Sequence, residues 1–470
     1  MRLSGLFFGA VTVLVQRVTA VDLVLRDEAS VKSAASSIAF GLVKYYTGNN
    51  TGDVPGNLPD PYFWWEAGAM FGTLIDYWAL TGDDSYNAIT SQAMLHQGSD
   101  TRDFMPVNQT RTLGNDDQGF WAMTAMTAAE LKFPDPPKDQ AQWLALAQAT
   151  FNQYASRWDT ATCGGGLRWQ IFNFNTGFNY KNSISNGCFF NIAARLARFT
   201  GNQTYAEWAA KVWDWQESMN LFRDGDVLDG VGIKQVNGEE VCPDHIDQIQ
   251  WSYNAGIFLH GAAAMYNFTD GNPIWKRRVD EMLNSTTEAF YNTTAVNSDT
   301  PVLHEQFCES HVICNIDQRS FKGYLTRWMA RTTQLVPHTY DVIYPLLESS
   351  AKAAARACSG TTPAPAFKGH PGTACGFSWT TGGFDGLVGV GEQMNALSAI
   401  ASTLIDRTAA PVTADTGGTS SGDPAGGANG PGSSPVRELR AITTGDRVAA
   451  GFLTSAIALS IVAGCAFVMI

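Results

Sequence analysis

The sequence lacks the patterns that mark nucleic-acid-binding proteins and the common cofactor enzymes. Its 44 Asp and Glu residues outnumber 31 Lys and Arg residues, which gives a formal net charge of −13 at pH 7, and no Lys/Arg-rich run occurs. Binding to nucleic acid depends on neutralising phosphates, so the composition argues against that partner and favours neutral or cationic ones. No phosphate-binding loop, dinucleotide fingerprint or HExxH helix is present, and we expect no cofactor and no metal site. A calcium ion held by loops is the alternative left open.

Histidine and cysteine are few and irregularly spaced. The run HEQFCESHVIC, residues 304–314, matches no standard zinc-ligand spacing, and a local disulfide between Cys308 and Cys314 is the better interpretation. Of the 8 cysteines, Cys465 lies in the hydrophobic C-terminal tail. The other seven, in an oxidising compartment, leave at least one free thiol because their number is odd. They are Cys163, Cys188, Cys242, Cys308, Cys314, Cys358 and Cys375.

Both ends of the chain carry features of secretory-pathway signals. Residues 1–20 place Arg2 before an apolar run and end with cleavage-type residues, which is typical of a signal peptide. Residues 448–470 form an uncharged hydrophobic tail that follows a small-residue stretch and a polar spacer, the order of a GPI-anchor signal. We predict attachment at Gly432 or Ser433 and removal of the tail, with a plain transmembrane anchor as the alternative. The protein is then expected at the outer face of the plasma membrane or in the cell wall.

The region between these signals divides into one folded domain and a stalk. Residues 409–447 are rich in Pro, Gly, Ser and Thr and poor in core-forming residues, which predicts a flexible stalk. Residues 21–408 remain for a single large fold. Several N-glycosylation sequons agree with secretion. They begin at Asn49, Asn108, Asn202, Asn267, Asn284 and Asn292.

The folded region also lacks sustained strand-type alternation, and long segments of helical period dominate it. One class of segment is apolar most of the way round, as in 67–78, 122–131, 191–199, 255–266, 325–333 and 394–405, and such helices are buried. The other class is amphipathic, as in 140–158, 204–219 and 273–290. The two classes alternate as a weak repeat of helix pairs, with further outer segments from Ala29 and Tyr340. We predict an all-α (α/α)6 barrel, a toroid of about six inner and six outer helices.

Loop length distinguishes the two ends of this barrel. Connections that enter inner helices are long and rich in Trp, Tyr, Asn and Gly, and long loops gathered on one face of a rigid scaffold usually form the binding site. The stretch GNDDQGFW, residues 114–121, belongs to this set. Its adjacent Asp116 and Asp117 suit a helix N-terminus, where Asp is a common cap. A cap and a catalytic pair of acids can coexist at this position.

Two neighbouring carboxyl groups fit the chemistry of glycosidic bond cleavage. One group must be protonated to help the leaving oxygen depart, and the other ionised to attack or support the anomeric carbon. Retaining enzymes place the two about 5–5.5 Å apart, and consecutive Cα atoms are about 3.8 Å apart, so adjacency favours retention. Repulsion between like charges raises the apparent pKa of one of them, which suits a general acid. Spacing alone does not decide which residue takes which role.

Sugar binding predicts aromatic platforms mixed with planar amides in these loops, although core packing is the commoner fate of a large aromatic. Asp229 is a further loop carboxylate, for which turn chemistry is the alternative interpretation. The candidate sugar-binding residues are Trp64, Trp65, Trp121, Trp169, Tyr180, Asn182, Asp229, Gln250, Trp251, Asn254 and Gln393.

Six stretches together resemble the fungal Dcw1/Dfg5 group of glycoside hydrolase family 76, the endo-α-1,6-mannanases. They are GNLPDPYFWWEAGAMFGTLIDYW, GNDDQGFW, GGLRWQIFNFNTGFNYKNSISNG, QWSYNAGIFLHGAA, FKGYLTRWMARTT and GVGEQMNALSAI. The resemblance implies an (α/α)6 barrel and a retaining mechanism with Asp116 as nucleophile and Asp117 as general acid/base. It also implies that Asp229 contacts sugar hydroxyls. Fungal members of the group are thought to join the mannose-containing GPI glycan of other proteins to wall β-glucan.

The leading hypothesis is therefore a retaining glycosidase or transglycosidase for α-1,6-linked mannose, acting as a monomer with a mannan or GPI glycan as donor and β-glucan as acceptor. Sequence does not separate hydrolysis from transfer. A non-catalytic wall-binding lectin on a GPI stalk is the alternative, because aromatic platforms alone would serve it. A polysaccharide lyase ranks last, since the acidic balance disfavours uronic acid substrates.

Overall fold

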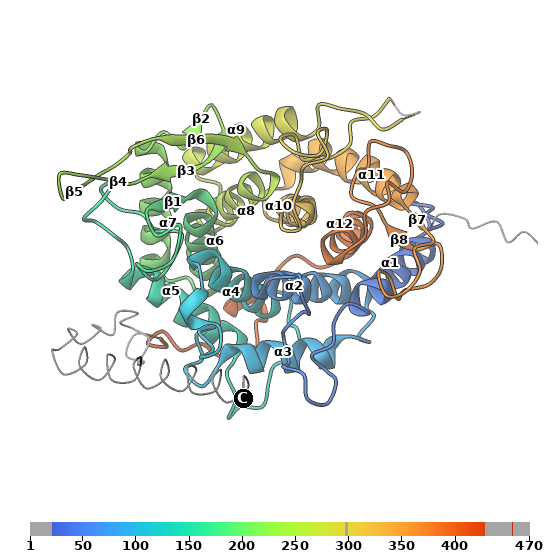
Figure 1. Cartoon of the computed structure of the whole chain (residues 1–470), viewed down its shortest axis with the longest axis horizontal. Helices are drawn as coiled ribbons and strands as arrows, with labels where there is room; N and C mark the ends of the chain where they lie inside the picture. The colour runs from blue at the N-terminus through green and yellow to red at the C-terminus, as the bar shows by residue number, and fades with distance from the viewer. Residues whose placement is uncertain (1–20, 297–298, 428–453, 455–470) are drawn as a thin grey trace, which may run out of the picture.

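The structure is a computed structural model that describes residues 21–296, 299–427 and 454. Across these residues twelve α-helices form an inner and an outer ring (Figure 1). The inner helices are α2 (Trp64–Thr81), α4 (Asn115–Glu130), α6 (Ser183–Thr200), α8 (Ser252–Phe268), α10 (Phe321–Leu335) and α12 (Val390–Ala401). The outer helices are α1 (Glu28–Val43), α3 (Asn87–Gly98), α5 (Trp143–Ser156), α7 (Gln203–Ser218), α9 (Pro273–Phe290) and α11 (Tyr340–Ala357). Each inner helix packs on the next, and α12 closes the ring against α2. The predicted (α/α)6 barrel is confirmed.

Local signals place the ends of several helices. Side chains of Asp27, Asn202 and Asn272 accept hydrogen bonds from backbone amides in the first turns of α1, α7 and α9. Gly82 and Gly201 end α2 and α6 with φ of 80° and 69°, the left-handed conformation that glycine adopts without strain. These caps produce the short turns that lead from inner to outer helices.

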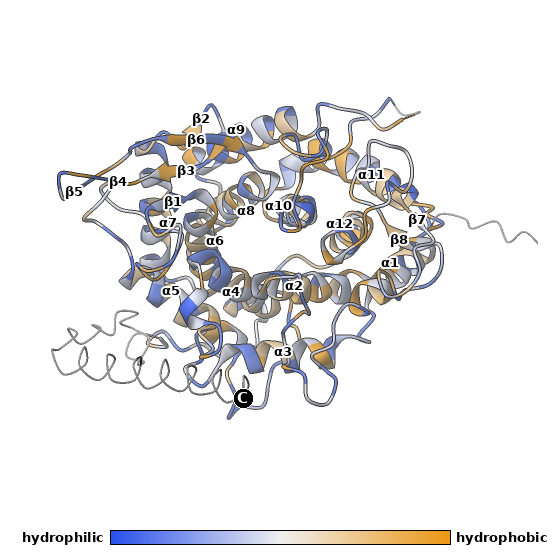
Figure 2. Cartoon of the chain, in the orientation of Figure 1, coloured by the Kyte–Doolittle hydropathy of each residue, from blue (hydrophilic) through white to orange (hydrophobic). Residues whose placement is uncertain are grey.

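The inner helices are buried but carry more charge than their apolar patterning predicted. Figure 2 shows hydrophilic stretches on α10, which contains Arg327 and Arg331. Both arginines bind Asp76 of α2, with N–O distances of 2.6 and 2.7 Å. A buried charge is tolerated only when it is paired and hydrogen-bonded. The ion cluster therefore ties α2 to α10, two helices that are not neighbours in the ring.

A small β-structure beside the barrel was not predicted. β3 (Asp226–Gly232) pairs antiparallel with β1 (Tyr180–Asn182), β2 (Phe222–Arg223) and β6 (Ile246–Gln250). Two further pairs are β4 (Lys234–Val236) with β5 (Glu239–Val241), and β7 (Cys358–Gly360) with β8 (Ala374–Cys375). Short 3-10 helices are η1 (Thr110–Thr112), η2 (Gln318–Ser320), η3 (Pro337–Thr339), η4 (Ser402–Arg407) and η5 (Ala414–Thr416). The strands are two to seven residues long, too short for alternation to stand out in the sequence.

Three disulfides cross-link the described residues: Cys163–Cys242, Cys308–Cys314 and Cys358–Cys375. The predicted local disulfide between Cys308 and Cys314 is confirmed. The expected free thiol is Cys188, which is buried on α6.

Residues 409–427, which we expected in a flexible stalk, pack against the barrel and are named the strap here. The guanidinium of Arg198 donates to the carbonyls of Pro411 and Val412, at 2.5 and 3.2 Å. Further along, the strap follows α5 (the red segment near α4 and α5 in Figure 1). The folded domain therefore extends past residue 408, because carbonyl and hydroxyl groups of this polar segment satisfy donors on α5 and α6.

The predicted signal peptide, GPI attachment residues Gly432 and Ser433, and all of the hydrophobic tail except residue 454 lie outside the described residues. Among the residues that the structure describes, none of the helices has the length and apolar character needed to cross a membrane.

Candidate active site

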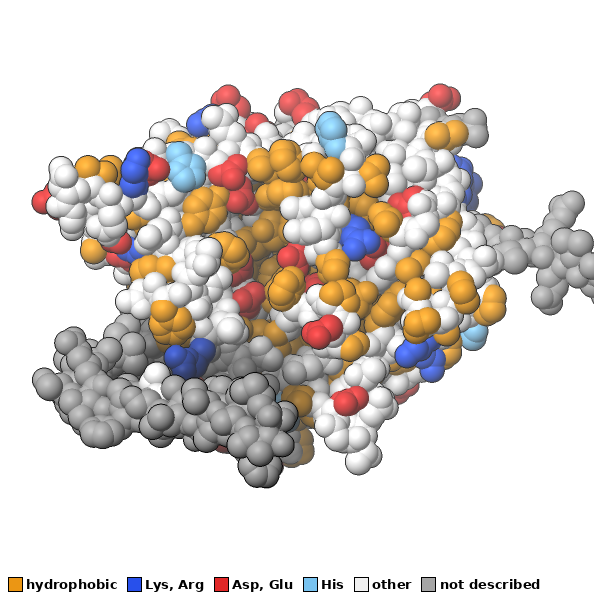
Figure 3. All heavy atoms as spheres, viewed as in Figure 1, with side chains coloured by type: hydrophobic (Ala, Val, Ile, Leu, Met, Phe, Trp, Pro, Cys, Tyr) orange, Lys and Arg blue, Asp and Glu red, His pale blue; other side chains and the backbone are white. Residues whose placement is uncertain are grey.

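A two-part cleft opens at the end of the barrel where the inner helices α4 and α10 begin. Figure 3 shows a hollow in the middle of this face, with hydrophobic and acidic side chains around it. One part, named the Asp229 half, has a volume of about 220 Å³ and is lined by Trp65, Asp116, Asp117, Phe120, Trp169, Tyr180, Asn182, Asp229, Trp251, Tyr253, Asn315, Asp317, Gln318 and Phe321. The other, named the Phe63 half, has about 300 Å³ and is lined by Phe63, Trp64, Trp65, Gln109, Thr112, Leu113, Asp117, Trp169, Gln170 and Asp317. Trp65, Asp117, Trp169 and Asp317 line both and are named the waist.

The adjacent aspartates occupy the first turn of α4. Asp117 acts as a cap, because the N–H of Gly114 donates to its carboxylate at 2.6 Å. Asp117 also lines both halves of the cleft, so the same residue caps the helix and contributes an acid to the cleft. Gly114 leaves no space for a side chain, since a Cβ there would lie 2.3 Å from the Asp116 carboxylate.

A buried polar network fixes the residue that precedes the pair. The Asn115 N–H donates to the Trp169 carbonyl at 2.8 Å, and its side-chain amide donates to the Arg168 carbonyl at 2.8 Å. Its side-chain oxygen accepts from Arg157 at 2.5 Å, and its backbone carbonyl accepts from the Tyr154 hydroxyl. All polar groups of Asn115 are thus hydrogen-bonded, and the first turn of α4 is preorganised.

Burial and like charge shift the titration of the pair. Burial and then the charge of Asp117 raise the pKa of Asp116 well above its ordinary value, against the opposing effect of backbone amides and of Asn182. Burial also raises the pKa of Asp117 to about 7, although the Gly114 hydrogen bond lowers it. Two ordinary aspartates would both be ionised at neutral pH. This pair retains a proton there, which is the state that acid-assisted bond cleavage requires.

Asp229 reaches the cleft from the small sheet. The register between β3 and β6 shifts beside it, where β6 has one extra residue, and such bulges re-aim side chains. Its carboxylate accepts from the Tyr180 hydroxyl at 2.8 Å and from the Asn254 amide at 3.3 Å. Burial raises its pKa to about 6 despite these hydrogen bonds. The four-stranded sheet thus places a third carboxylate in the cleft with Asp116 and Asp117.

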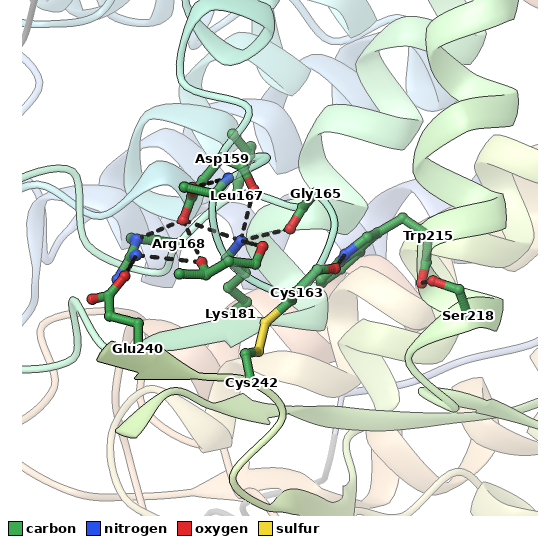
Figure 4. The surroundings of a disulfide bond; sticks show 12 residues. Asp159, Cys163, Gly165, Leu167, Arg168, Lys181, Trp215, Ser218, Glu240 and Cys242 are labelled. Carbon is green, nitrogen blue, oxygen red and sulfur yellow. Dashed lines mark hydrogen bonds and ion pairs between the residues drawn. A yellow bond between two sulfur atoms is a disulfide. The ribbon is translucent and has the colours of Figure 1, made fainter. Parts of the chain in front are cut away.

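The wall that carries Trp169 and Tyr180 is held by the cluster in Figure 4. The buried Lys181 ammonium donates to the carbonyls of Thr162 and Gly165, at 2.8 and 2.6 Å, and lies 3.2 Å from the Asp159 carboxylate. The Cys163–Cys242 disulfide joins the same loop to the strand pair β4–β5. An ammonium with several buried acceptors fixes a loop that has no regular structure of its own.

Seven of the predicted sugar-binding residues line the cleft. Trp65 and Trp169 lie at the waist, and Trp64 lines the Phe63 half. Tyr180, Asn182, Asp229 and Trp251 line the Asp229 half.

The other four expected residues do not line either half. Trp121 has no exposed surface and packs on Trp64 and Phe104, because its position on α4 faces α2 rather than the bore. The side-chain amide of Gln250 donates to the carboxylate of Asp226, the first residue of β3, at 2.9 Å. Gln393 is buried between α12 and α1, where it accepts from the Cys375 amide. Asn254 is buried and acts on the site only through Asp229.

The sequence did not predict six residues of the Asp229 half, nor five further residues of the Phe63 half, which are Phe63, Gln109, Thr112, Leu113 and Gln170. Phe120, Tyr253 and Phe321 stood inside quoted motifs but were not selected, and Tyr253 stacks on Phe321 with ring centroids 3.8 Å apart. Asn315, Asp317 and Gln318 come from the loop before α10. This loop is also long and enters an inner helix, which is the signal that would have found it.

The predicted glycosylation sites lie on the surface of the described residues. All six sequon asparagines are exposed, so each is open to an attached glycan. Within the described ranges, no group of three or more His, Cys, Asp or Glu side chains is arranged to hold a metal ion.

Comparison with known proteins identifies the family. The model of glycosyl hydrolase family 76 matches residues 30–415. The chain belongs to glycosyl hydrolase family 76. Among family 76 relatives, it is 46% identical to "Mannan endo-1,6-alpha-mannosidase DCW1" of Saccharomyces cerevisiae, over 94% of each chain. It is 40% identical to "Mannan endo-1,6-alpha-mannosidase DFG5" of the same yeast, over 96% of this chain and 94% of that one.

Solved family 76 structures share the fold. Dfg5 from Chaetomium thermophilum in complex with glucosamine has a TM-score of 0.78 and 44% identity, over 86% of this chain and 97% of that one. An α-1,6-mannanase, GH76A of Salegentibacter, has a TM-score of 0.60 and 19% identity, over 81% of this chain and 99% of that one. The latter is an inactive variant, with two consecutive aspartates replaced by asparagine, in complex with α-1,6-mannotriose.

Proposed function

We propose that this protein cleaves glycosidic bonds of α-1,6-linked mannose with retention of configuration. The observation that carries the proposal is the pair of adjacent, half-buried carboxyl groups at the centre of an aromatic cleft. The names of the fungal relatives, at 40–46% identity, support the substrate class. The inactive mannanase variant, altered at two consecutive aspartates, supports the role of such a pair.

In the first step, a carboxylate oxygen of Asp116 attacks the anomeric carbon and forms a glycosyl ester. The bond between that carbon and the leaving oxygen breaks, and the leaving oxygen takes the proton of Asp117. The ester removes the charge of Asp116, so Asp117 is more acidic than in the free enzyme. In the second step, Asp117 takes a proton from water or a sugar hydroxyl, whose oxygen displaces Asp116.

The assignment of the two roles follows the family resemblance. The pKa of Asp116 is raised further than that of Asp117, which taken alone would leave the proton on Asp116. Because the two groups titrate as a pair, the protons belong to the pair rather than to one residue. Asn182 and the amides of the first turn, which favour the Asp116 carboxylate, support its role as nucleophile. Asp229, held by Tyr180 and Asn254, is proposed to bind sugar hydroxyls.

We further propose that the second step is transfer, in which a β-glucan hydroxyl receives the mannose-containing glycan of a GPI-anchored protein. The setting would be the outer face of the plasma membrane, with this protein itself GPI-anchored and monomeric. The C-terminal sequence supports the anchor, and the exposed sequons support secretion. A cleft with two halves supports binding of sugars on both sides of the reacting bond.

The catalytic proposal is tested by replacing each aspartate with asparagine. Asp116→Asn is expected to reduce turnover of α-1,6-mannotetraose by about a thousandfold or more, and Asp117→Asn by about 10²-fold to 10⁴-fold. A mechanism-based label of mannose configuration should attach to Asp116 in peptide mapping. Unchanged turnover in both variants would reject the mechanism. A parent protein that binds the glycan without cleaving any bond would support the lectin alternative.

Hydrolysis and transfer are separated by product analysis. The enzyme is incubated with a GPI-type mannoside donor, with and without a β-glucan oligosaccharide. Transfer predicts a new donor–glucan conjugate that is lost in Asp116→Asn. Free sugar as the sole product in both mixtures would restrict the protein to hydrolysis.

A further inference from the structure

The waist of the cleft contains a carboxylate that the catalytic proposal does not use. Asp317 lines both halves, as do Asp117, Trp65 and Trp169. A glycan that occupies both halves must pass these four side chains. Asp317 comes from the loop before α10, whereas Asp117 comes from α4. The two acids thus reach the reacting bond from different walls.

One oxygen of Asp317 lacks a hydrogen bond. The side chain of Trp65 donates to the carboxylate, but Oδ1 is buried and has no partner among the described residues. Buried polar atoms almost always have a partner, and an unsatisfied carboxylate oxygen is costly. A donor from a bound sugar would satisfy it.

The loop holds Asp317 in place independently of any ligand. The backbone N–H and hydroxyl of Ser320 donate to the Asp317 carbonyl at 2.9 and 2.6 Å. Asn315 and Gln318 also bond each other. The side-chain oxygen of each residue accepts from the backbone N–H of the other at 2.9 Å. The Cys308–Cys314 disulfide ends immediately before this turn. The carboxylate is therefore preorganised.

The ionisable groups around Asp317 are mainly acids. The charge of Asp317 acts on Glu66 of α2 and on Asp117 of α4, and Glu392 of α12 also acts on Glu66. Burial and then the charge of Asp317 raise the pKa of Glu66 to about 8. The nearby cation, Arg319, is paired with Glu392 at 2.8 Å. Among the described residues, neither half of the cleft is lined by lysine or arginine.

We propose that Asp317 is a substrate-binding residue that accepts a hydrogen bond from a hydroxyl or protonated amine of the sugar at the waist, and that it disfavours a phosphate group on that same sugar. An ionised carboxylate in a cleft that no lysine or arginine lines attracts donors and cations and repels phosphate. This inference rests on the proposed function for its substrate class. It adds a specificity residue that acts beside the catalytic pair.

Binding is measured by calorimetry in the Asp116→Asn background, so that no turnover is needed. The added changes are Asp317→Ala and Asp317→Asn, with Asp135→Asn as the control. Asp135 is exposed in the turn after α4, at the opposite end of the barrel, so it loses the same charge away from the cleft. The probes are α-1,6-mannotetraose, its monophosphorylated form, and an α-mannosyl glucosamine disaccharide, which separates hydroxyl from amine donors.

Asp317→Ala is expected to weaken mannotetraose binding by about tenfold or more, because a charge-assisted hydrogen bond is lost. Asp317→Asn should reduce discrimination against the phosphorylated glycan severalfold, and Asp135→Asn should change neither. A larger loss for the glucosamine disaccharide assigns the amine as donor, and a larger loss for mannotetraose assigns a hydroxyl. Parent-like binding and discrimination in folded Asp317 variants would overturn the proposal. If the Asp317 variants lose binding but the unaltered protein cleaves no mannoside, the binding role of Asp317 stands and the proposed catalytic function is refuted.

A kinetic readout distinguishes substrate contact from a structural role. The charge of Asp317 opposes ionisation of Asp117 and so raises its pKa. In the otherwise unaltered enzyme, Asp317→Asn should therefore move the basic limb of the kcat/KM profile to lower pH and raise KM. A simple loss of folded protein would reduce kcat with neither effect, and that result would count against the proposal.

Discussion

At the scale of single residues, Asp117 shows how much a short motif can reveal. Its adjacency to Asp116 at the start of a helix predicted both a cap and an acid, and the structure gives it the cap hydrogen bond and a place at the waist. Asp317 has no such signature, because the loop that carries it meets the first turn of α4 only in the folded barrel. Trp121 shows the converse error. Its residue type suggested a stacking surface for a sugar, but its position on α4 places the ring in the hydrophobic core.

The lack of space at Gly114 gives a prediction at this scale. In Gly114→Ala the new Cβ would lie 2.3 Å from the Asp116 carboxylate and would push it out of position. We expect kcat to fall by about 10-fold to 100-fold, since small misplacements of catalytic groups cost that much, while the melting temperature changes little. The matched control is Gly383→Ala, where a Cβ meets nothing within 4 Å. Equal kcat in the two variants would contradict this account.

At the scale of elements, the helices were predictable and the connections were not. Apolar periodicity and glycine ends located the inner helices, because these signals lie within one segment. The strand β3 pairs with β2 over only 3 to 5 residues, but its pairing with β1 and β6 spans about 15 to 50 residues, so the sequence near Asp229 did not predict the sheet that carries it. The charges inside α10 were also hidden, since Arg327 and Arg331 are acceptable in a buried helix only because Asp76 of α2 meets them.

This ion cluster gives a prediction for the ring of inner helices. Asp76→Asn leaves two buried guanidinium groups without their anion, and we expect the free energy of unfolding to fall by about 3–5 kcal/mol in urea titrations. Burial opposes ionisation of Asp76, but the two arginines outweigh it and lower its pKa to about 2. Its stabilising effect is therefore present above the ordinary value of 3.8 and is lost as pH falls towards 2. Asp341→Asn, at an exposed position in the first turn of α11, is the control and should cost less than about 1 kcal/mol. A similar loss in both variants would show that the cluster has no special role.

At the scale of the whole molecule, the repeat of helix pairs predicted the barrel and the end that carries the cleft. Composition misplaced its C-terminal boundary, because residues 409–427 resemble a linker yet bond to the barrel. Side-chain amides and hydroxyls carry that attachment: the Leu144 amide donates to the Ser420 hydroxyl at 3.0 Å, and Asn152 donates to the carbonyls of Pro424 and Gly426. A polar segment of this kind is attached by hydrogen bonds, and a search for hydrophobic patterns in the sequence cannot predict them.

The strap gives a prediction about truncation. A protein that ends at residue 408 loses the acceptors of Arg198 and Asn152, and we expect its free energy of unfolding to be lower by about 2 kcal/mol or more than that of a protein ending at residue 427. Urea unfolding of both proteins measures the difference. Asn152→Ala in the longer protein should give an intermediate value. Equal stability of the two truncated proteins would mean that the strap adds nothing to the fold.

The path of the strap also bears on access to the cleft. It bonds α5 first at Leu144, near the end of the barrel opposite the cleft, and then at Asn152, two residues before Tyr154 of the network that holds Asn115. The described part of the strap thus runs along the side of the barrel towards the end that carries the cleft. Because none of residues 409–427 lines either half of the cleft, the strap can stabilise the barrel without narrowing the entrance to the site.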